Sequence, residues 1–214
     1  MQLPDRIESV ARLSAPLAAS LGLELWGVEI LGASRPLVRV YVDAPNLPEQ
    51  RDESAENGRE DAGPETPGVT IEQCAELSRL LGLSLDVEDM FASGWTLEVS
   101  SPGLERPFFR LEQLRAYLGR EVEVVLSAPL AAWPGRKKFH GVLSRTTDNA
   151  FTLDLPLAPV ARRAADEPAS ADIPWSAVRK AVLVHIFPEP GAKKGGNTKR
   201  HGTSGSNLPH GGVA

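Results

Sequence analysis

The sequence of 214 residues contains a single cysteine, and this scarcity excludes an internal disulfide and any cysteine-rich zinc site. No apolar run approaches the roughly 18 residues that a membrane span needs, so no membrane partner is expected. Aromatic residues make up only 6% of the chain. The hydrophobic fraction of 42% is still enough for a packed core, and the length fits one or two domains.

Sequence motifs of catalysis and cofactor binding are also missing. The chain has no GxxxxGK[ST] loop, no GxGxxG after a strand, no HExxH and no GxSxG. Of its four histidines, His201 and His210 fall in a glycine-rich tail, and His140 and His185 fall in expected strands. These residues do not supply a nucleophile–base pair, so we expect no enzyme, no catalytic residue, no metal and no cofactor.

The net charge of −5 is unevenly distributed along the chain. Acidic residues dominate the first half, whereas basic residues are in excess after position 107. An acidic surface favours a basic protein and a basic surface favours RNA, so the asymmetry suggests two domains with different partners. Ordinary solubility charge is the alternative interpretation.

Residues 1–106 show a periodicity that predicts an α-β-β-α-β order, typical of a two-layer α+β domain. One helix is expected over 4–21. A second begins after Thr70, which forms a capping box with Gln73, and Gly82 is expected to end it. The strands of this domain are expected over 24–31, 37–43 and 95–100.

Finer expectations concern individual side chains of this domain. Alternation places Trp26, Val28 and Ile30 on one face of their strand. Ile71 is expected to start the buried stripe of the second helix. The acidic run 86–89 resembles the first turn of a further short helix, because acids there favour the helix dipole.

Two segments lack the composition of a core. Residues 44–67 form an acidic insertion without aromatic residues or periodicity, and residues 191–214 form a basic tail rich in glycine. Neither can bury enough apolar surface to offset the entropy of ordering, so both are predicted to be disordered.

Residues 107–190 predict a small all-β domain after a short helix over 111–118. The five strands are expected over 121–126, 139–143, 151–155, 173–175 and 178–187. Five short strands in this length indicate a small five-stranded barrel, in which Pro174 must lie at an edge or a strand end.

The loop before the second of these strands carries the densest basic run of the chain, Arg136, Lys137 and Lys138. These residues are candidates for contact with RNA phosphates, because such contacts need cations but no particular base sequence. A solvated hairpin tip is the alternative. Trp133, in a Trp-Pro-Gly loop, is the one tryptophan expected to be exposed.

The most unusual segment links the two expected domains. It consists of Ser100, Ser101, Pro102, Gly103, Leu104, Glu105, Arg106 and Pro107. Pro102-Gly103 suits the central positions of a type II turn, with glycine supplying a positive φ. Arg106 lies in a charged stretch beside this turn. The segment predicts a tight connection that fixes the angle between the domains.

The run LEVSSPGLERPF resembles the signature V-S-S-P-G-L-[DE]-R-P of the ribosome maturation factor RimP family, which it matches from Val99 to Pro107. LGLELWGVEI and RPLVRVYVD are similar to the first two strands of the family, and GVTIEQCAELSRLLGLSLD is similar to its second helix. FHGVL and IPWSAVRKAVL resemble its later strands. The resemblance covers residues 1–43 and 68–187.

The resemblance implies a cytoplasmic assembly factor with an α+β domain followed by an Sm-like, SH3-like barrel. Such a factor associates with the immature small ribosomal subunit and its RNA. It aids the incorporation of a basic small-subunit protein near the central pseudoknot. We expect a monomer. The alternative is a general Sm-like RNA-binding module, which would form a ring and bind many RNAs.

Overall fold

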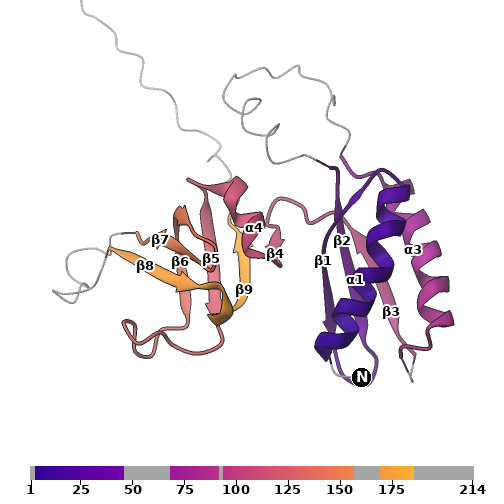
Figure 1. Ribbon diagram of the computed structural model, residues 1–214, viewed down its shortest axis with the longest axis horizontal. Helices are drawn as coiled ribbons and strands as arrows, with labels where there is room; N and C mark the ends of the chain where they lie inside the picture. Colours follow the sequence, from indigo (N-terminus) through magenta and orange to yellow (C-terminus); the bar gives the residue numbers. More distant parts are fainter. Residues whose placement is uncertain (1–2, 46–67, 92–93, 157–168, 186–214) are drawn as a thin grey trace, which may run out of the picture.

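The computed structural model describes residues 3–45, 68–91, 94–156 and 169–185. Almost all of the acidic insertion 44–67 and the whole of the tail 191–214 lie outside these residues, so the prediction of disorder there stays a prediction. Within the described residues the chain forms an N-terminal and a C-terminal region, each with its own sheet (Figure 1).

The N-terminal region is a three-stranded sheet with two helices on one face (Figure 1). The sheet contains, in spatial order, β1 (Glu24–Leu31), β2 (Leu37–Asp43) and β3 (Thr96–Ser100). The helices are α1 (Leu3–Ser20) and α3 (Ile71–Val87). β1 runs antiparallel and β3 parallel to β2, and the predicted α-β-β-α-β order is confirmed.

α3 begins where the sequence predicts, but it ends five residues later than predicted. Thr70 is the N-cap, and its backbone and side chain exchange hydrogen bonds with Gln73, which confirms the capping box. The predicted end at Gly82 is wrong, because Leu81 and Leu85 are both buried beside it. Burial of a leucine contributes about 1.5–3 kcal/mol, which exceeds the ~1 kcal/mol cost of a helical glycine.

The longer helix changes the interpretation of the neighbouring residues. Asp86 and Val87 are the last residues of α3, and Glu88 is its C-cap, so the predicted short helix at 86–89 is wrong. Ile71, expected on the buried stripe, is largely exposed. It is the first residue of the helix, and the buried stripe begins only at Leu77.

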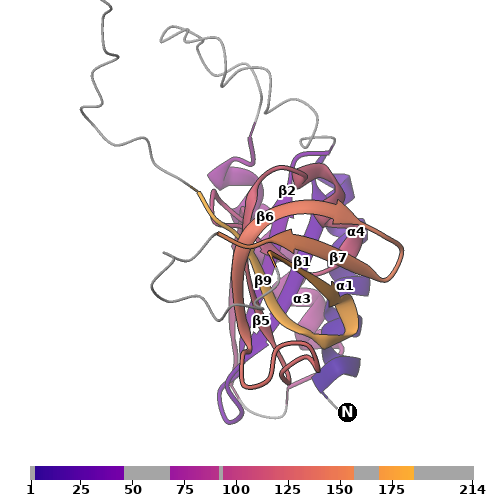
Figure 2. The same cartoon turned by 90° about the vertical axis from the view of Figure 1, so that its left-hand side faces the viewer.

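The C-terminal region is a six-stranded sheet with antiparallel pairing throughout, and it curves strongly (Figure 2). Its spatial order is β4 (Pro107–Phe108), β9 (Val178–Leu183), β5 (Glu121–Leu126), β6 (Lys138–Thr146), β7 (Ala150–Asp154) and β8 (Ser170–Pro174). A short α4 (Leu111–Leu114) precedes β5 and continues as the 3-10 turn η1 (Arg115–Tyr117).

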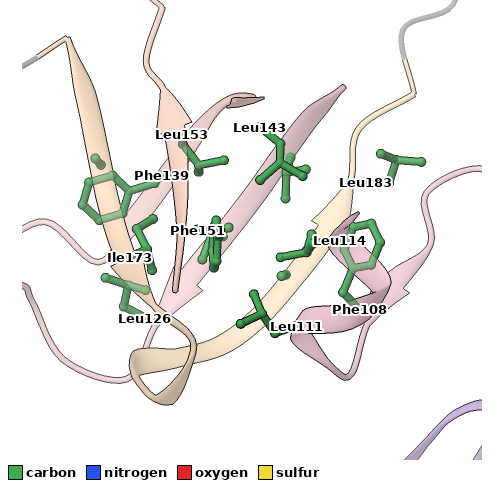
Figure 3. Close-up of a cluster of buried hydrophobic side chains, with 14 of the residues drawn as sticks. Phe108, Leu111, Leu114, Leu126, Phe139, Leu143, Phe151, Leu153, Ile173 and Leu183 are labelled. Carbon is green, nitrogen blue, oxygen red and sulfur yellow. The ribbon is translucent and has the colours of Figure 1, made fainter. Parts of the chain in front are cut away.

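The hollow of this curved sheet is filled by apolar side chains (Figure 3). Phe139, Leu143 and Phe151 come from β6 and β7, and Leu111 and Leu114 come from α4. All five are at most 4% exposed. The helix therefore closes one side of the core that the sheet leaves open.

The predicted separate β region is confirmed, but the prediction of a five-stranded barrel is wrong in two respects. The sheet has six strands, because Pro107 and Phe108 form the short β4 against β9. Among the described residues no pairing joins β4 to β8, so both are edge strands. β4 is only two residues long, and β8 ends at Pro174, which lacks a backbone N–H to extend a ladder. The placement of Pro174 at a strand end is confirmed.

Trp133 is buried, so its predicted exposure is also wrong. Its ring meets that of Phe139 edge-on, with centroids 5.5 Å apart, in the core of the C-terminal region. Trp133 is part of the buried cluster of the C-terminal region. Exposure of the whole loop would have left this apolar area in water.

Candidate functional site

The segment between β3 and β4 is a compact turn whose glycine has the predicted backbone conformation. Gly103 has a φ of +70°, and its N–H donates to the side-chain oxygen of Ser101 at 3.1 Å. Pro102 is buried, whereas Leu104 and Glu105 are exposed. A positive φ is tolerated at little cost only by glycine and a few polar residues, which accounts for glycine at this position.

Arg106 is the central residue of the connection between the two regions. Its side chain is only 2% exposed. The Nη1 atom donates to Asp43 Oδ2 at 2.7 Å and to the Tyr117 hydroxyl at 2.8 Å. The guanidinium carbon lies 4.9 Å from the centroid of the Trp26 ring. Arg106 thus joins the end of β2 to η1 in the C-terminal region.

The ion pair of Arg106 and Asp43 is buried on both sides. The Asp43 side chain is 5% exposed, and its second oxygen accepts the N–H of Ala44 at 3.0 Å. Taking two charges out of water is costly, and it is tolerated only where the partners compensate each other. Removal of either member would therefore leave the other as an uncompensated buried charge.

Trp26 belongs to the connection because of a β-bulge in β1. The register with β2 shifts between Leu25 and Gly27, so Trp26 is turned away from the face that Val28 occupies. Its Nε1 donates to the carbonyl of Pro107 at 2.7 Å. The predicted common face for Trp26 and Val28 is wrong, because a bulge interrupts the alternation on which it rested.

Phe109 packs where β1 has no side chain. A Cβ atom on Gly27 would collide with the Phe109 ring, so the ring lies directly over the glycine backbone. The same ring lies 5.5 Å from that of Tyr41, centroid to centroid. Burial, and then the nearby carboxylate of Glu29, raises the pKa of Tyr41, whose hydroxyl donates to that carboxylate at 3.2 Å.

We call this set of contacts the Arg106 interface. It is built by Trp26, Gly27, Tyr41 and Asp43 from the N-terminal region and by Arg106, Pro107, Phe108, Phe109, Gln113 and Tyr117 from the chain that follows. It combines a buried ion pair, hydrogen bonds and aromatic packing. These contacts join the two regions on both sides of the segment Ser100–Pro107.

Sequence reasoning singled out Arg106 only as part of the unusual segment. Arg106 is not part of a solvated charged stretch, because its side chain is buried while that of its neighbour Glu105 is exposed. Asp43 and Gln113 were not identified. An aspartate at the end of an apolar strand gives no sequence signal for a partner 63 positions away.

The basic run lies apart from this interface, at the start of β6. Arg136 packs over Phe139, with its guanidinium carbon 4.7 Å from the ring centroid. Lys138 pairs with Glu123 at 2.8 Å, and Lys137 donates to the carbonyl of Ser127 at 3.2 Å. Both lysines are exposed. The structure therefore leaves the two lysines in contact with solvent, whereas Arg136 belongs partly to the loop core.

The described residues hold no cluster of three metal-ligating side chains. Within this part of the chain, no helix has the length and apolar character to cross a membrane. His140 Nε2 on β6 lies 2.9 Å from Glu121 Oε2 on the neighbouring strand β5. His201 and His210 lie outside the described residues.

Comparison with known proteins identifies relatives over most of the chain. Residues 13–105 match the family model described as the RimP N-terminal domain. A protein of Lawsonia intracellularis is 45% identical over 193 residues, covering 90% of this chain and 93% of its own length. A protein of Nitratidesulfovibrio vulgaris strain DP4 is 46% identical over 185 residues, covering 86% of this chain and 94% of its own length. Both carry the name ribosome maturation factor RimP, and this chain belongs to the RimP family.

Proposed function

We propose that this protein is a ribosome maturation factor that acts on the immature small ribosomal subunit. The observation that carries the proposal is the alignment with relatives named as ribosome maturation factors over nine-tenths of the chain. The family resemblance of the segment Val99–Pro107 implies the small subunit in particular. In this proposal the protein has no enzymatic activity and acts in the cytoplasm as a monomer.

The two regions have different partners in this proposal. The acidic N-terminal domain, residues 1–106, receives a basic small-subunit protein and aids its incorporation near the central pseudoknot. Charge complementarity of this kind speeds encounter and fixes orientation. The C-terminal domain, residues 107–190, contacts ribosomal RNA through Lys137 and Lys138. Their exposure supports that role, since phosphate contacts need cations in reach of solvent.

In this proposal the segment Ser100–Pro107 contributes to function through the Arg106 interface. A partner that spans two domains binds more tightly when they are already held in the bound orientation, because less freedom is lost on binding. The segment Ser100–Pro107 would supply that orientation by placing Arg106 against Asp43. The two surfaces would then form one composite binding face.

Co-sedimentation tests the proposal directly. The purified protein is run on a sucrose gradient by itself and after mixing with immature small subunits, mature small subunits, large subunits or complete ribosomes. We expect the protein to migrate with immature small subunits and to sediment alone as a monomer. A ring oligomer that binds unrelated RNAs equally well would favour the Sm-like RNA-binding module, and no binding to small subunits would refute the proposal.

A further inference from the structure

Gln113 makes an unusual set of hydrogen bonds for a glutamine side chain. It is 9% exposed, and both ends of its amide are used. The Nε2 atom donates to the carbonyl of Trp26 at 2.7 Å. The Oε1 atom accepts the backbone N–H groups of Phe109 at 2.8 Å and Arg110 at 3.1 Å. One side chain therefore satisfies three backbone groups from two regions.

The partner in the N-terminal region is the bulged residue of β1. A bulge leaves one residue outside the regular ladder, and a buried carbonyl without a partner is costly. The bulge at Trp26 sends the indole toward Pro107 and offers its carbonyl to Gln113. On the other side, the oxygen of Gln113 binds N–H groups at the start of α4, which have no partner within that short helix.

We infer that Gln113 is a positioning residue that ties α4 to the bulged strand β1 and so holds the two regions in a fixed orientation. It acts beside the Arg106–Asp43 ion pair and not through it, because its hydrogen bonds go to Trp26, Phe109 and Arg110. The inference deepens the proposed function, in which a fixed orientation is needed, but its test requires no ribosome.

The substitution Gln113→Glu separates the two roles of the side chain. A carboxylate still accepts the N–H groups of Phe109 and Arg110, so α4 keeps its cap. It cannot donate to the Trp26 carbonyl, and it places an acceptor against that oxygen. Asn149→Asp is the matched control, because it adds the same charge at an exposed position of the C-terminal region.

Hydrogen exchange of the Trp26 indole N–H reports opening of the interface, since this group donates to Pro107 across it. NMR measures its protection factor in the full chain, together with the backbone N–H groups of β5 as a reference for the fold. We expect Gln113→Glu to lower indole protection by about 5- to 150-fold, the range of a typical coupling between sites, with β5 protection unchanged. Asn149→Asp should match the parent.

Two results would overturn the inference. Indole protection within twofold of the parent would show that the Gln113–Trp26 bond does not hold the regions together. Equal loss of protection in the indole and in β5 would show that Gln113 only stabilises the C-terminal fold. If Gln113→Glu loses indole protection as expected but the parent protein fails to bind small subunits, the proposed function is wrong and the role of Gln113 stands.

Discussion

Arg106 and Asp43 are 63 positions apart in sequence, yet their Nη1 and Oδ2 atoms lie 2.7 Å apart and both side chains are almost fully buried. Arg106 belongs to the segment that resembles the family signature, and Asp43 ends a strand of the N-terminal sheet. The segment therefore does more than reverse the chain. It places the Arg106 guanidinium against the Asp43 carboxylate of the N-terminal region.

The first prediction concerns this ion pair. Asp43→Asn keeps the shape of the side chain but leaves the Arg106 charge buried without a counter-ion. Breaking a buried pair in this way costs about 3–5 kcal/mol, so urea unfolding should show a loss of that size. Glu98→Gln is the matched control, because Glu98 forms an exposed ion pair with Arg39 at 2.6 Å in the same sheet.

The control should cost only about 0–1 kcal/mol, since exposed ion pairs contribute little. If both substitutions lower the free energy of unfolding equally, the buried ion pair of Asp43 contributes no more than an exposed one, and the prediction is wrong.

The second prediction concerns the turn. Gly103 has a φ of +70°, and no atom lies within 4 Å of a Cβ placed there, so substitution meets backbone strain without a steric collision. Gly103→Val should cost about 1–2 kcal/mol, and Gly103→Asn should cost less because asparagine tolerates this conformation. Thermal unfolding measures both. We expect the valine variant to fold but to bind small subunits more weakly.

Equal behaviour of the valine variant and the parent in stability and in binding would show that the turn does not position the two regions. Arg106→Ala cannot serve as a control for Gly103→Val, because it would leave Asp43 as a buried charge without a partner.

The third prediction uses two glycines in opposite environments. Gly27→Ala places a methyl group against the Phe109 ring, and overpacking of this kind costs about 1–3 kcal/mol. Gly82→Ala adds a methyl group in open space within α3, where alanine is the better helix former, and should stabilise by up to ~1 kcal/mol. Calorimetry of the two variants should give melting temperatures that shift in opposite directions. A Gly27→Ala variant that melts at or above the temperature of the parent would contradict the packing of Phe109 on Gly27.

The fourth prediction separates RNA binding from stability in the basic loop. Lys137→Ala removes an exposed cation, so RNA affinity should fall uniformly across sequences and the salt dependence should decrease by about one phosphate contact. Arg136→Ala removes the contacts with Trp133 and Phe139 and should lower the melting temperature. Filter binding at several salt concentrations measures the first effect. Unchanged RNA affinity of the lysine variant would exclude Lys137 as a phosphate contact.

Local sequence signals predicted the elements of this fold well where the determinant is local. The capping box of Thr70 and Gln73 and the positive φ of Gly103 depend on neighbouring residues, and both are confirmed. The end of α3 was predicted wrongly because burial of Leu81 and Leu85 outweighs the tendency of Gly82 to end the helix. That burial depends on the sheet beneath the helix.

The interface could not be predicted because its determinants are distant in sequence. The bulge at Trp26 breaks the alternation that strand patterns assume, and its partners Pro107 and Gln113 are more than 80 positions away. The hydropathy of Asp43 and Gln113 suggests exposed positions, but both are buried by their partners. Sequence similarity identified the family without identifying these contacts.

The measurement that tests the central claim most directly is the ribosome profile of cells that lack this protein. Sucrose-gradient sedimentation during fast growth, combined with analysis of the ends of the ribosomal RNA, should show depleted mature small subunits and unprocessed small-subunit RNA. Supplying the parent protein should restore the profile, and Asp43→Asn should restore it less. A normal profile in the absence of the protein, at several growth temperatures, would contradict a role in maturation of the small subunit.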